Sequence, residues 1–452
     1  MKKKLLNKTN TLIVTGQAGK SFGSYLLGEI KINYSKYFYI FALFFLFSIL
    51  VSYRVVITRQ TLYFDMFFVY STLTFATLTI KYLGSTLHFT DRWAKYRPRK
   101  WPDIDIIIPA YNEGKAIYDT VYSITKANYP KDRINIVLVN DGSKDDTLKY
   151  IDLAVKDFAN MKIVRINFKK NKGKKEAMAE GIRRIESDTI IFIDSDSSID
   201  PNCLKEIVRP FSKDKKIGAV SGHALVSNAD ANLLAKMQEI RYFNAFRSAK
   251  ALESLLGFVS CCPGCCSAYK REAILPIMKA WLNQSFLGVK CMYGDDRSLT
   301  NLVLKSRWKA VYNEKAVAYT IVPTTLKQYN KQQIRWKKSW LRESVVVLSF
   351  VWKRNPFTAF LMIADTLTPF LAPIIIARIM FVYSVNNFNG FAYYMIGILI
   401  FATCLGLLYR VHNNRGNKWL KGALFSSLIA ILTFWQLPYA LMTLRDSKWG
   451  TR

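Results

Sequence analysis

Histidine is scarce in this chain of 452 residues. Its three copies lie far apart in the sequence: His88, His223 and His412. Two adjacent pairs of cysteines, Cys261–Cys262 and Cys265–Cys266, have the Cys-x-x-Cys spacing found in many zinc sites. Such a site needs a second group of ligands, and none is near in the sequence. We therefore interpret these cysteines as reduced thiols in a loop of small residues.

Acidic residues are also few, because 32 Asp and Glu stand against 65 Lys and Arg, which gives a formal net charge of +33. Such an excess is typical of proteins that bind nucleic acid, anionic lipid or an anionic substrate. Here the basic residues crowd the segments that flank long apolar runs, which favours a lipid surface. We expect no nucleic-acid partner.

A cleavable signal peptide is not expected, because the first apolar run starts only near Tyr37. Hydrophobic residues make up 51% of the chain, yet 21% of the residues are charged. The apolar residues stand in dense blocks at both ends, around a charged middle. A chain of this length can hold one large soluble domain and several membrane spans.

The apolar blocks predict two membrane spans before the charged middle and three after it. The expected spans are 37–53, 62–83, 360–383, 391–409 and 419–441, with an interfacial helix at 344–352. Flanking basic residues place the amino terminus and the charged middle in the cytoplasm. Five crossings would put the carboxyl terminus outside, whereas Arg445, Lys448 and Arg452 favour the inside. One late stretch is therefore re-entrant, interfacial or split in two.

The charged middle alternates short β-branched runs with amphipathic stretches. The expected strands are 104–108, 134–139, 162–166 and 189–193, and the expected helices are 113–126, 147–158 and 174–185. This alternation predicts an α/β domain with a parallel sheet wrapped by helices. In such sheets ligands bind at the carboxyl ends of the strands, where this sequence has polar, turn-forming residues.

Two of these strand ends suit a nucleotide. The first strand leads into Tyr111 and Glu113, and the second leads into Asp141, which precedes a Gly-Ser turn. A carboxylate at this point can accept hydrogen bonds from a base or a ribose while the turn approaches closely. Alone, Asp-Gly-Ser is an ordinary turn, but beside the first strand end it indicates a nucleotide pocket.

The next two features suit a diphosphate and a metal ion. Lys174 lies in a cationic turn that opens a helix, a geometry that favours phosphate, although a solvated basic loop would have the same sequence. The fourth strand ends in Asp194 and Asp196, whose spacing directs both carboxylates to one side. If they are more than a strand-end turn, they can share Mg²⁺ or Mn²⁺, since hard oxygen ligands favour these ions.

Asp295 and Asp296 form a third acidic cluster. A carboxylate without a metal partner in its own motif can deprotonate an acceptor hydroxyl. Repulsion between the two carboxylates raises the pKa of one of them, whereas the neighbouring Arg297 acts in the opposite direction. The same pair can also cap a helix, and both roles can coexist.

An element of Gln332, Arg335 and Trp336, with the spacing Gln-x-x-Arg-Trp, offers an amide, a guanidinium fork and an indole face before the late apolar runs. It suits a site where an anionic, sugar-bearing ligand meets a membrane channel, although a basic, aromatic segment beside a membrane would look alike. The acidic motifs upstream favour the first interpretation.

Taken in order, these motifs resemble the signature of processive family 2 glycosyltransferases, which include the cellulose, chitin and hyaluronan synthases. The residues that carry the resemblance are Asp141, Asp194, Asp196, Asp296, Gln332, Arg335 and Trp336. Segments 293–301 and 332–343 are most similar to hyaluronan synthases, and the closing Trp-Gly-Thr-Arg resembles the gating segment of hyaluronan and chitin synthases. The loop 262–269 is nearer to the Pro-Gly-Cys element of chitin synthases, which leaves the sugar specificity open.

The resemblance implies a role for each site residue. Tyr111, Glu113, Asp141 and Lys174 would hold the uridine diphosphate donor, and Asp194 and Asp196 would serve the metal. Asp296, beside Asp295, would be the catalytic base, and Gln332, Arg335 and Trp336 would meet the acceptor and the pyrophosphate. Cys265 would border the acceptor, and Trp449 and Arg452 would close over the nucleotide.

The resemblance also implies a membrane protein with an α/β cytosolic domain, in which a GT-A-type (Rossmann-like) fold stands between transmembrane helices. The expected divisions are 1–100 with two spans, the glycosyltransferase domain at 101–330, the Gln-x-x-Arg-Trp element with interfacial helices at 331–356, transmembrane helices at 357–444 and a gating segment at 445–452. The protein would be multi-pass in the cell membrane and would need no obligate protein partner.

The expected activity is the processive, inverting polymerisation of UDP-GlcA and UDP-GlcNAc into hyaluronan, with Mg²⁺ or Mn²⁺, and translocation of the growing polysaccharide across the lipid bilayer. The main alternative is a chitin synthase or another β-glycan homopolymer synthase that uses one UDP-sugar. A non-processive enzyme acting on a lipid carrier is disfavoured by the Gln-x-x-Arg-Trp element and the terminal gating segment. A non-catalytic transporter or binding protein is disfavoured by the three acidic clusters at strand ends.

Overall fold

The computed structural model describes residues 66–88, 92–383, 388–412 and 431–446, together with isolated positions in the remaining segments. Nearly all of the first predicted span, 37–53, lies outside the described residues. The same holds for Trp449 and Arg452, and for residues 421–427 and 430 of the last predicted span.

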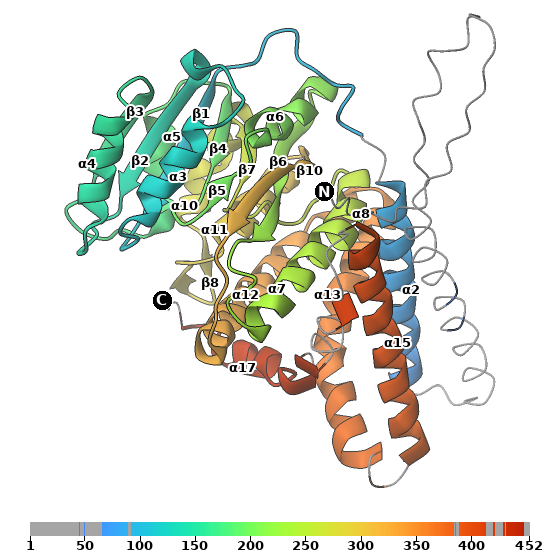
Figure 1. Ribbon diagram of the computed structural model, residues 1–452. Helices are drawn as coiled ribbons and strands as arrows, with labels where there is room; N and C mark the ends of the chain where they lie inside the picture. Colours follow the sequence, from blue (N-terminus) through green and yellow to red (C-terminus); the bar gives the residue numbers. More distant parts are fainter. Residues whose placement is uncertain are drawn as a thin grey trace, which may run out of the picture.

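A mixed sheet forms the centre of the globular part (Figure 1). Among the described residues its eight strands lie in the order β3-β2-β1-β4-β7-β6-β10-β5. The strand bounds are β1 Ile104–Ala110, β2 Ile134–Asn140, β3 Lys162–Asn167, β4 Thr189–Phe192, β5 Ser198–Ile199, β6 Ile217–Val226, β7 Ser267–Lys270 and β10 Lys309–Thr320. A separate hairpin pairs β8 (Ser285–Phe286) with β9 (Val289–Lys290).

The four predicted strands are parallel neighbours, but the sheet is not parallel throughout. Strand β7 runs antiparallel to both β4 and β6. A strand that is parallel to β4 would begin at the amino end of β4. Because β7 is antiparallel, its first residue, Ser267, pairs with Phe192 at the carboxyl end of β4. The loop before β7 therefore lies at the edge where the predicted site residues gather.

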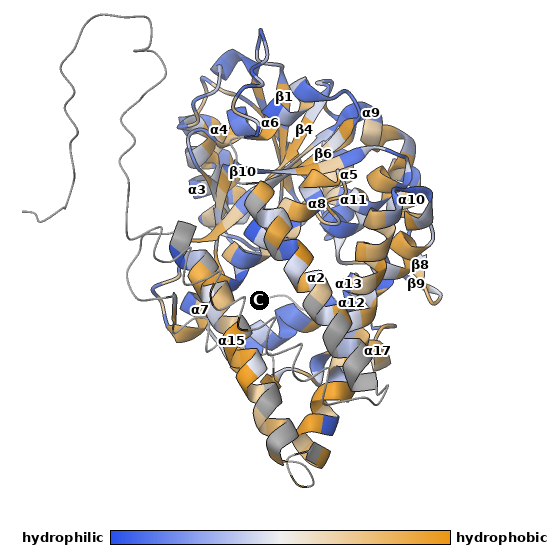
Figure 2. Cartoon of the chain, turned by 90° about the vertical axis from the view of Figure 1, so that its right-hand side faces the viewer, coloured by the Kyte–Doolittle hydropathy of each residue, from blue (hydrophilic) through white to orange (hydrophobic). Residues whose placement is uncertain are grey.

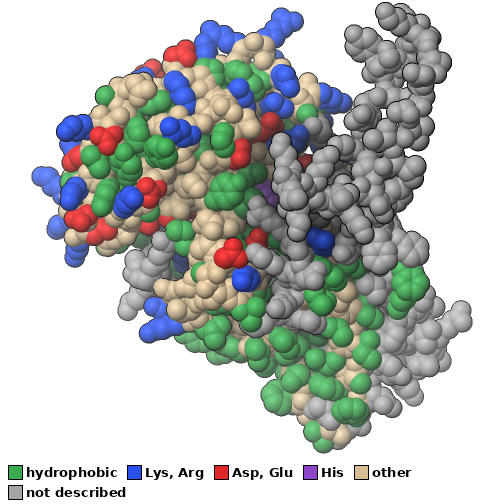
Figure 3. Space-filling model, in the orientation of Figure 1, with side chains coloured by type: hydrophobic (Ala, Val, Ile, Leu, Met, Phe, Trp, Pro, Cys, Tyr) green, Lys and Arg blue, Asp and Glu red, His purple; other side chains and the backbone are tan. Residues whose placement is uncertain are grey.

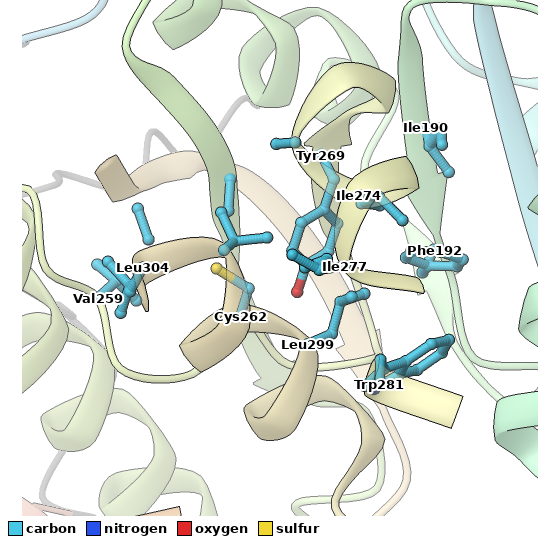
Figure 4. Packing of buried hydrophobic residues seen from close by; sticks show 14 of the residues in the cluster. Ile190, Phe192, Val259, Cys262, Tyr269, Ile274, Ile277, Trp281, Leu299 and Leu304 are labelled. Atoms are coloured by element: carbon cyan, nitrogen blue, oxygen red, sulfur yellow. The ribbon is translucent and has the colours of Figure 1, made fainter. Parts of the chain in front are cut away.

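Helices cover both faces of the sheet. Their bounds are α3 Ala116–Thr125, α4 Thr147–Asp157, α5 Lys174–Arg183, α6 Cys203–Lys213, α7 Leu233–Asn244, η2 Ala245–Lys250, α8 Ala251–Leu255, α9 Arg271–Ile274, η3 Leu275–Ile277, α10 Met278–Leu282 and α11 Asp295–Lys305. In β1, Ile106 packs in a cluster with α3, α4 and α6, while Ile107 packs with α5, α10 and α11. Figure 4 shows part of the second cluster, in which Trp281 and Leu299 lie near Phe192 and Tyr269.

Helix α12 (Leu326–Leu348) is one continuous helix of 23 residues. It begins after Thr325, whose side chain accepts a hydrogen bond from the Gln328 N–H. The expected domain division at residue 330 falls inside this helix. The predicted interfacial stretch at 344–352 consists of the last turn of α12 and the beginning of a short turn, η4 (Val351–Lys353).

Three apolar helices coincide with predicted spans: α2 (Met66–Leu87), α13 (Pro356–Arg378) and α15 (Phe388–His412). They project from the globular part, and hydrophobic residues dominate them in Figure 2. Charged side chains gather instead over the sheet and its helices (Figure 3). By length and composition, one helix in the described part of the chain, Pro356–Val382, could cross a membrane. Lys81 and Asp365 form an ion pair of 2.5 Å between α2 and α13.

The last predicted span is interrupted where the structure describes it. A turn at 433–435 precedes the short helix α17 (Gln436–Met442), which packs against α12 (Figure 1). Leu437 and Ala440 are buried against Leu341, and the Gln436 side chain donates a hydrogen bond of 2.8 Å to the side chain of Asn330. The described part of the predicted span 419–441 is therefore not one continuous helix.

Candidate active site

The ends of β1 and β2 lie side by side, as predicted. Ala110 pairs with Asn140 in the sheet, and the Asp141 N–H donates to the Ala110 carbonyl at 2.8 Å. Beyond β1, the Glu113 N–H donates to the Thr147 hydroxyl at 2.8 Å, which joins this strand end to the start of α4. Tyr111 and Glu113 are both half-buried at the same edge.

Asp141 is 3% exposed and holds the turn that opens α5. Its two carboxylate oxygens accept hydrogen bonds from the N–H groups of Lys172 at 2.7 Å and Gly173 at 2.9 Å. Gly173 has a φ of +94°, which glycine adopts without a steric penalty, and α5 begins at the next residue. Burial raises the pKa of Asp141 above its ordinary value, although both hydrogen bonds lower it.

Lys174, the first residue of α5, forms an ion pair with Asp194 at the end of β4. Burial alone would lower the pKa of Lys174, but the charges of Asp194, Asp295 and Asp296 more than offset this and raise its pKa. Lys174 therefore remains a cation. It lines a small cavity together with Asp194 and Asp296.

Gly264, in the loop before β7, lies directly against this ion pair. A Cβ atom at this position would lie 2.7 Å from Asp194 Oδ1 and 3.0 Å from Lys174 Nζ. The adjacent Cys265 is buried, and burial raises the pKa of its thiol well above the ordinary value. Gly264 lines the cavity next to Asp194, whereas the predicted contact residue Cys265 packs in the core.

Asp196 is half-buried two residues after Asp194. Its Oδ1 lies 3.5 Å from the Ser197 hydroxyl. In the described part of the chain no three His, Cys, Asp or Glu side chains are arranged to hold a metal ion by themselves. Two carboxylates fit Mg²⁺ or Mn²⁺ only if the ligand or water supplies the remaining oxygens, and Lys174 already neutralises one of them.

Asp295 and Asp296 stand at the start of α11, after Gly294, whose φ is +80° and which lies against Ser339 and Arg342 of α12. Asp295 is 3% exposed, and burial raises its pKa to about 6 against the charges of Lys175 and Lys174. Repulsion by Asp296 adds to this rise, as predicted, but burial is the larger cause.

Asp296 is half-buried and faces the cavity that Lys174 lines. Its Oδ1 accepts a hydrogen bond of 2.8 Å from the N–H of Arg297. The Cys261 thiol lies 3.7 Å from its Oδ2. The second carboxylate of the cluster is thus the one that lines the cavity.

Gln332, Arg335 and Trp336 all lie in α12, and Arg335 is the one of the three that interacts with the carboxylate cluster. Burial lowers the pKa of Arg335, whereas the charges of Asp296, Asp295 and Asp194 raise it, so this guanidinium interacts electrostatically with the carboxylate cluster. Trp336 is 41% exposed, and Gln332 is half-buried and accepts a hydrogen bond from its neighbour Gln333 at 3.4 Å.

Tyr242 in α7 is a site residue that sequence reasoning missed. Its ring centroid lies 6.1 Å from that of Trp336. Burial raises the pKa of its hydroxyl, and the group interacts electrostatically with Cys265, Asp196 and Arg335. No motif surrounds Tyr242 in the sequence, and its position depends on the packing of α7 against the site.

Comparison with known proteins supports a sugar-transfer site. Residues 102–339 match the family model described as glycosyltransferase like family 2. Over 357 residues the chain is 35% identical to the hyaluronan synthase of Streptococcus pyogenes, covering 76% of this chain and 82% of that protein. It is 29% identical over 353 residues to an N-acetylglucosaminyltransferase of Azorhizobium caulinodans, covering 78% of this chain and 87% of that protein.

A solved structure has the same fold. The mannosyltransferase of Pyrobaculum calidifontis, in complex with GDP-Man and Mn²⁺, superposes with a TM-score of 0.53 at 19% identity, covering 80% of this chain and 97% of that one. The expected GT-A-like fold is thereby confirmed. The acidic motifs of this chain meet at the carboxyl edge of that fold, and the chain is a glycosyltransferase that belongs to glycosyltransferase family 2.

Proposed function

We propose that this enzyme is a processive, inverting glycosyltransferase that polymerises UDP-GlcA and UDP-GlcNAc into hyaluronan. The observation that carries the proposal is the convergence of the Lys174–Asp194 pair, Asp296 and Arg335, with the exposed indole of Trp336 next to Arg335 in α12. The 35% identity to a hyaluronan synthase supports the choice of polymer.

The donor occupies the ends of β1 and β2. Asp141 holds the turn before α5 by accepting the N–H groups of Lys172 and Gly173, and the first residue of that helix, Lys174, lines the cavity with an ammonium that suits a diphosphate. Tyr111 and Glu113 border the base and ribose from the end of β1. This half of the site binds UDP whichever sugar is attached.

Asp296 takes the proton from an acceptor hydroxyl, because it lines the cavity and its charge is not consumed by the Lys174–Asp194 pair. The acceptor oxygen attacks the anomeric carbon while the bond from that carbon to the diphosphate oxygen breaks, and UDP leaves with the electron pair. Lys174 and Arg335 stabilise its growing negative charge. A single displacement inverts the anomeric carbon.

Asp194 and Asp196 would hold a divalent ion, which when bound stabilises the leaving diphosphate as a Lewis acid. The mannosyltransferase of the same fold is described in complex with Mn²⁺, which supports this role. The ordinary preference of carboxylate oxygens includes both Mg²⁺ and Mn²⁺.

The acceptor end of the polymer stacks on Trp336, with Tyr242 beside it and Gln332 one turn earlier in α12. From there the chain would leave between the apolar helices of a multi-pass protein of the cell membrane, with the catalytic domain in the cytosol and without an obligate protein partner. Trp449 and Arg452 would close over the nucleotide. In support, Tyr293 and Lys338 contact Asp446 near the end of the described chain.

A homopolymer such as chitin is the second candidate. The Pro-Gly-Cys loop that contains Gly264 favours it, as does the similarity to an N-acetylglucosaminyltransferase. Both candidates use the same base, metal ligands and donor pocket, so the products distinguish them.

Product analysis of the purified protein in detergent tests the proposal. It is supplied with Mg²⁺ or Mn²⁺ and with UDP-GlcNAc alone, UDP-GlcA alone or both. We expect polymer only with both donors, and we expect hyaluronidase to degrade it. Polymer from UDP-GlcNAc alone that chitinase degrades would overturn the hyaluronan assignment in favour of the second candidate.

A further inference from the structure

The Cys261 thiol is the one side-chain donor recorded on Asp296 in the described part of the chain. Its sulfur lies 3.7 Å from Asp296 Oδ2, within the range of a hydrogen bond that involves sulfur. The other oxygen, Oδ1, accepts the Arg297 backbone N–H at 2.8 Å. Both ends of the carboxylate therefore have a neutral donor.

Two contacts from the preceding helices fix the position of Cys261. Lys250, the last residue of η2, donates to the Cys261 carbonyl. Glu253 in α8 accepts hydrogen bonds from the N–H of Ser260 at 3.0 Å and from its hydroxyl at 3.2 Å. The segment next to Gly264 is thus held from one side by these two helices.

A third contact ties the same loop to the helix that carries Asp296. The Cys262 N–H donates to the Thr300 hydroxyl at 3.0 Å, and this hydroxyl donates to the Asp296 carbonyl at 2.7 Å. Tyr269 lies 3.0 Å from the same hydroxyl, so Thr300 joins β7, the loop and α11. These hydrogen bonds hold the backbone of the loop at a fixed distance from α11, and they therefore set the distance between Cys261 and Asp296.

A thiol is suited to orienting a base. An ammonium or guanidinium at this distance would stabilise the carboxylate strongly and reduce its basicity, whereas S–H is a weak, neutral donor. Burial raises the pKa of the Cys261 thiol to about 11, which keeps the proton on sulfur at neutral pH. Such a donor restricts rotation of the carboxylate while leaving its charge available.

We propose that Cys261 is a positioning residue for the sugar-transfer reaction, which orients the Asp296 carboxylate by donating its S–H to Oδ2. The inference rests on the proposed role of Asp296 as the base. The loop before β7 then has two functions: Gly264 borders the Lys174–Asp194 pair, and Cys261 orients Asp296.

The test compares Cys261→Val, which is apolar and somewhat larger and removes the donor, with Cys261→Ser, which is slightly smaller and restores a donor. We expect valine to lower kcat about five- to tenfold with little change in the KM for either UDP-sugar, because a weak hydrogen bond acts on the base alone. We expect serine to recover kcat to within about twofold. Cys404→Val, in α15, is the matched control and is expected to leave kcat unchanged.

Three other results would each have a distinct meaning. Equal losses of kcat in the valine and serine variants would overturn the inference in favour of packing, and melting temperatures in detergent would reveal misfolding of the valine variant. If both Cys261 variants have the wild-type kcat and Asp296→Asn is inactive, the positioning role of Cys261 is overturned, but the role of Asp296 as the base stands. An active Asp296→Asn variant would instead refute the proposed base.

Discussion

Gly264 illustrates how a single residue without a side chain sustains the site. Its Cα faces the Lys174–Asp194 pair so closely that a methyl group would lie 2.7 Å from Asp194 Oδ1. Contacts this short force the ion pair or the loop to move. The small residue is required by the space between two charged groups, and no left-handed φ is recorded for it.

The first prediction concerns Gly264→Ala. Overpacking of about 1–3 kcal/mol should displace Asp194 or Lys174 and lower kcat/KM for the UDP-sugar by about ten- to a hundredfold. Steady-state kinetics in detergent measure this. Gly397→Ala in α15 is the control, since a Cβ there meets nothing within 4 Å. Unchanged kinetics of Gly264→Ala would show that the loop does not border the donor site.

The second prediction concerns the pH dependence of stability through Asp295. Its pKa of about 6 in the folded protein exceeds the ordinary 3.8, so deprotonation costs the folded state more than the unfolded state, by about 3 kcal/mol in total. This contribution is present below pH 4 and is lost as the pH rises through 6. Asp295→Asn cannot ionise. The melting temperature of this variant minus that of the wild type should therefore be larger at pH 7.5 than at pH 5. A difference that is the same at both pH values would contradict the pKa.

At the scale of elements, a buried polar network locks α12 to the helices that carry the acidic motifs. Glu343 in α12 is 1% exposed and accepts hydrogen bonds from Gln284 at 2.7 Å, Asn301 at 3.2 Å and Arg342 at 3.0 Å. Arg342 in turn donates to the Tyr293 carbonyl at 2.7 Å, just before Gly294. The Arg335 and Trp336 side chains are thereby held in register with Asp296.

The third prediction concerns Glu343→Gln. Removal of the charge leaves Arg342 buried without its anionic partner, which should cost about 3–5 kcal/mol and lower the melting temperature. The rate should fall as well, because α12 carries Arg335. Thermal unfolding and initial rates, measured side by side, check this. The exposed Glu186→Gln serves as the control, and equal stability of both variants would show that the network contributes little.

The reversed direction of β7 has a functional consequence at the same scale. Because β7 runs against β4, the loop before it reaches the carboxyl edge of the sheet. This edge also receives the starts of α5 and α11. A fully parallel sheet would have placed that loop at the opposite edge, away from Asp194 and Asp296.

At the scale of the whole molecule, the fourth prediction concerns metal removal. In the described part of the chain, the divalent ion has the carboxylates of Asp194 and Asp196, and Lys174 is already paired to the first, so the ion should be held weakly and in part by the diphosphate. EDTA should abolish polymer synthesis, and excess Mg²⁺ or Mn²⁺ should restore it. The melting temperature without nucleotide should hardly change. Full activity in EDTA would exclude a metal requirement.

The globular part and the apolar helices were separable from the sequence, because burial in a sheet and contact with lipid leave different patterns. β-Branched runs such as Ile104–Ala110 marked the strands, and long apolar stretches marked α13 and α15. The four parallel strands also followed from the alternation of strands and helices. The antiparallel β7 did not, since a run of four residues has no distinctive period.

By itself, the sequence determined the family, the acidic motifs and the edge of the sheet where they meet, because motif spacing and strand periodicity are local properties of the chain. Only the tertiary structure decided that Lys174 pairs with Asp194, that Gly264 lies against this pair while Cys265 is buried, and that Tyr242 and Cys261 join the site. These contacts join residues far apart in the chain. Their distances depend on how α7, α11 and α12 pack against the sheet, which no local pattern encodes.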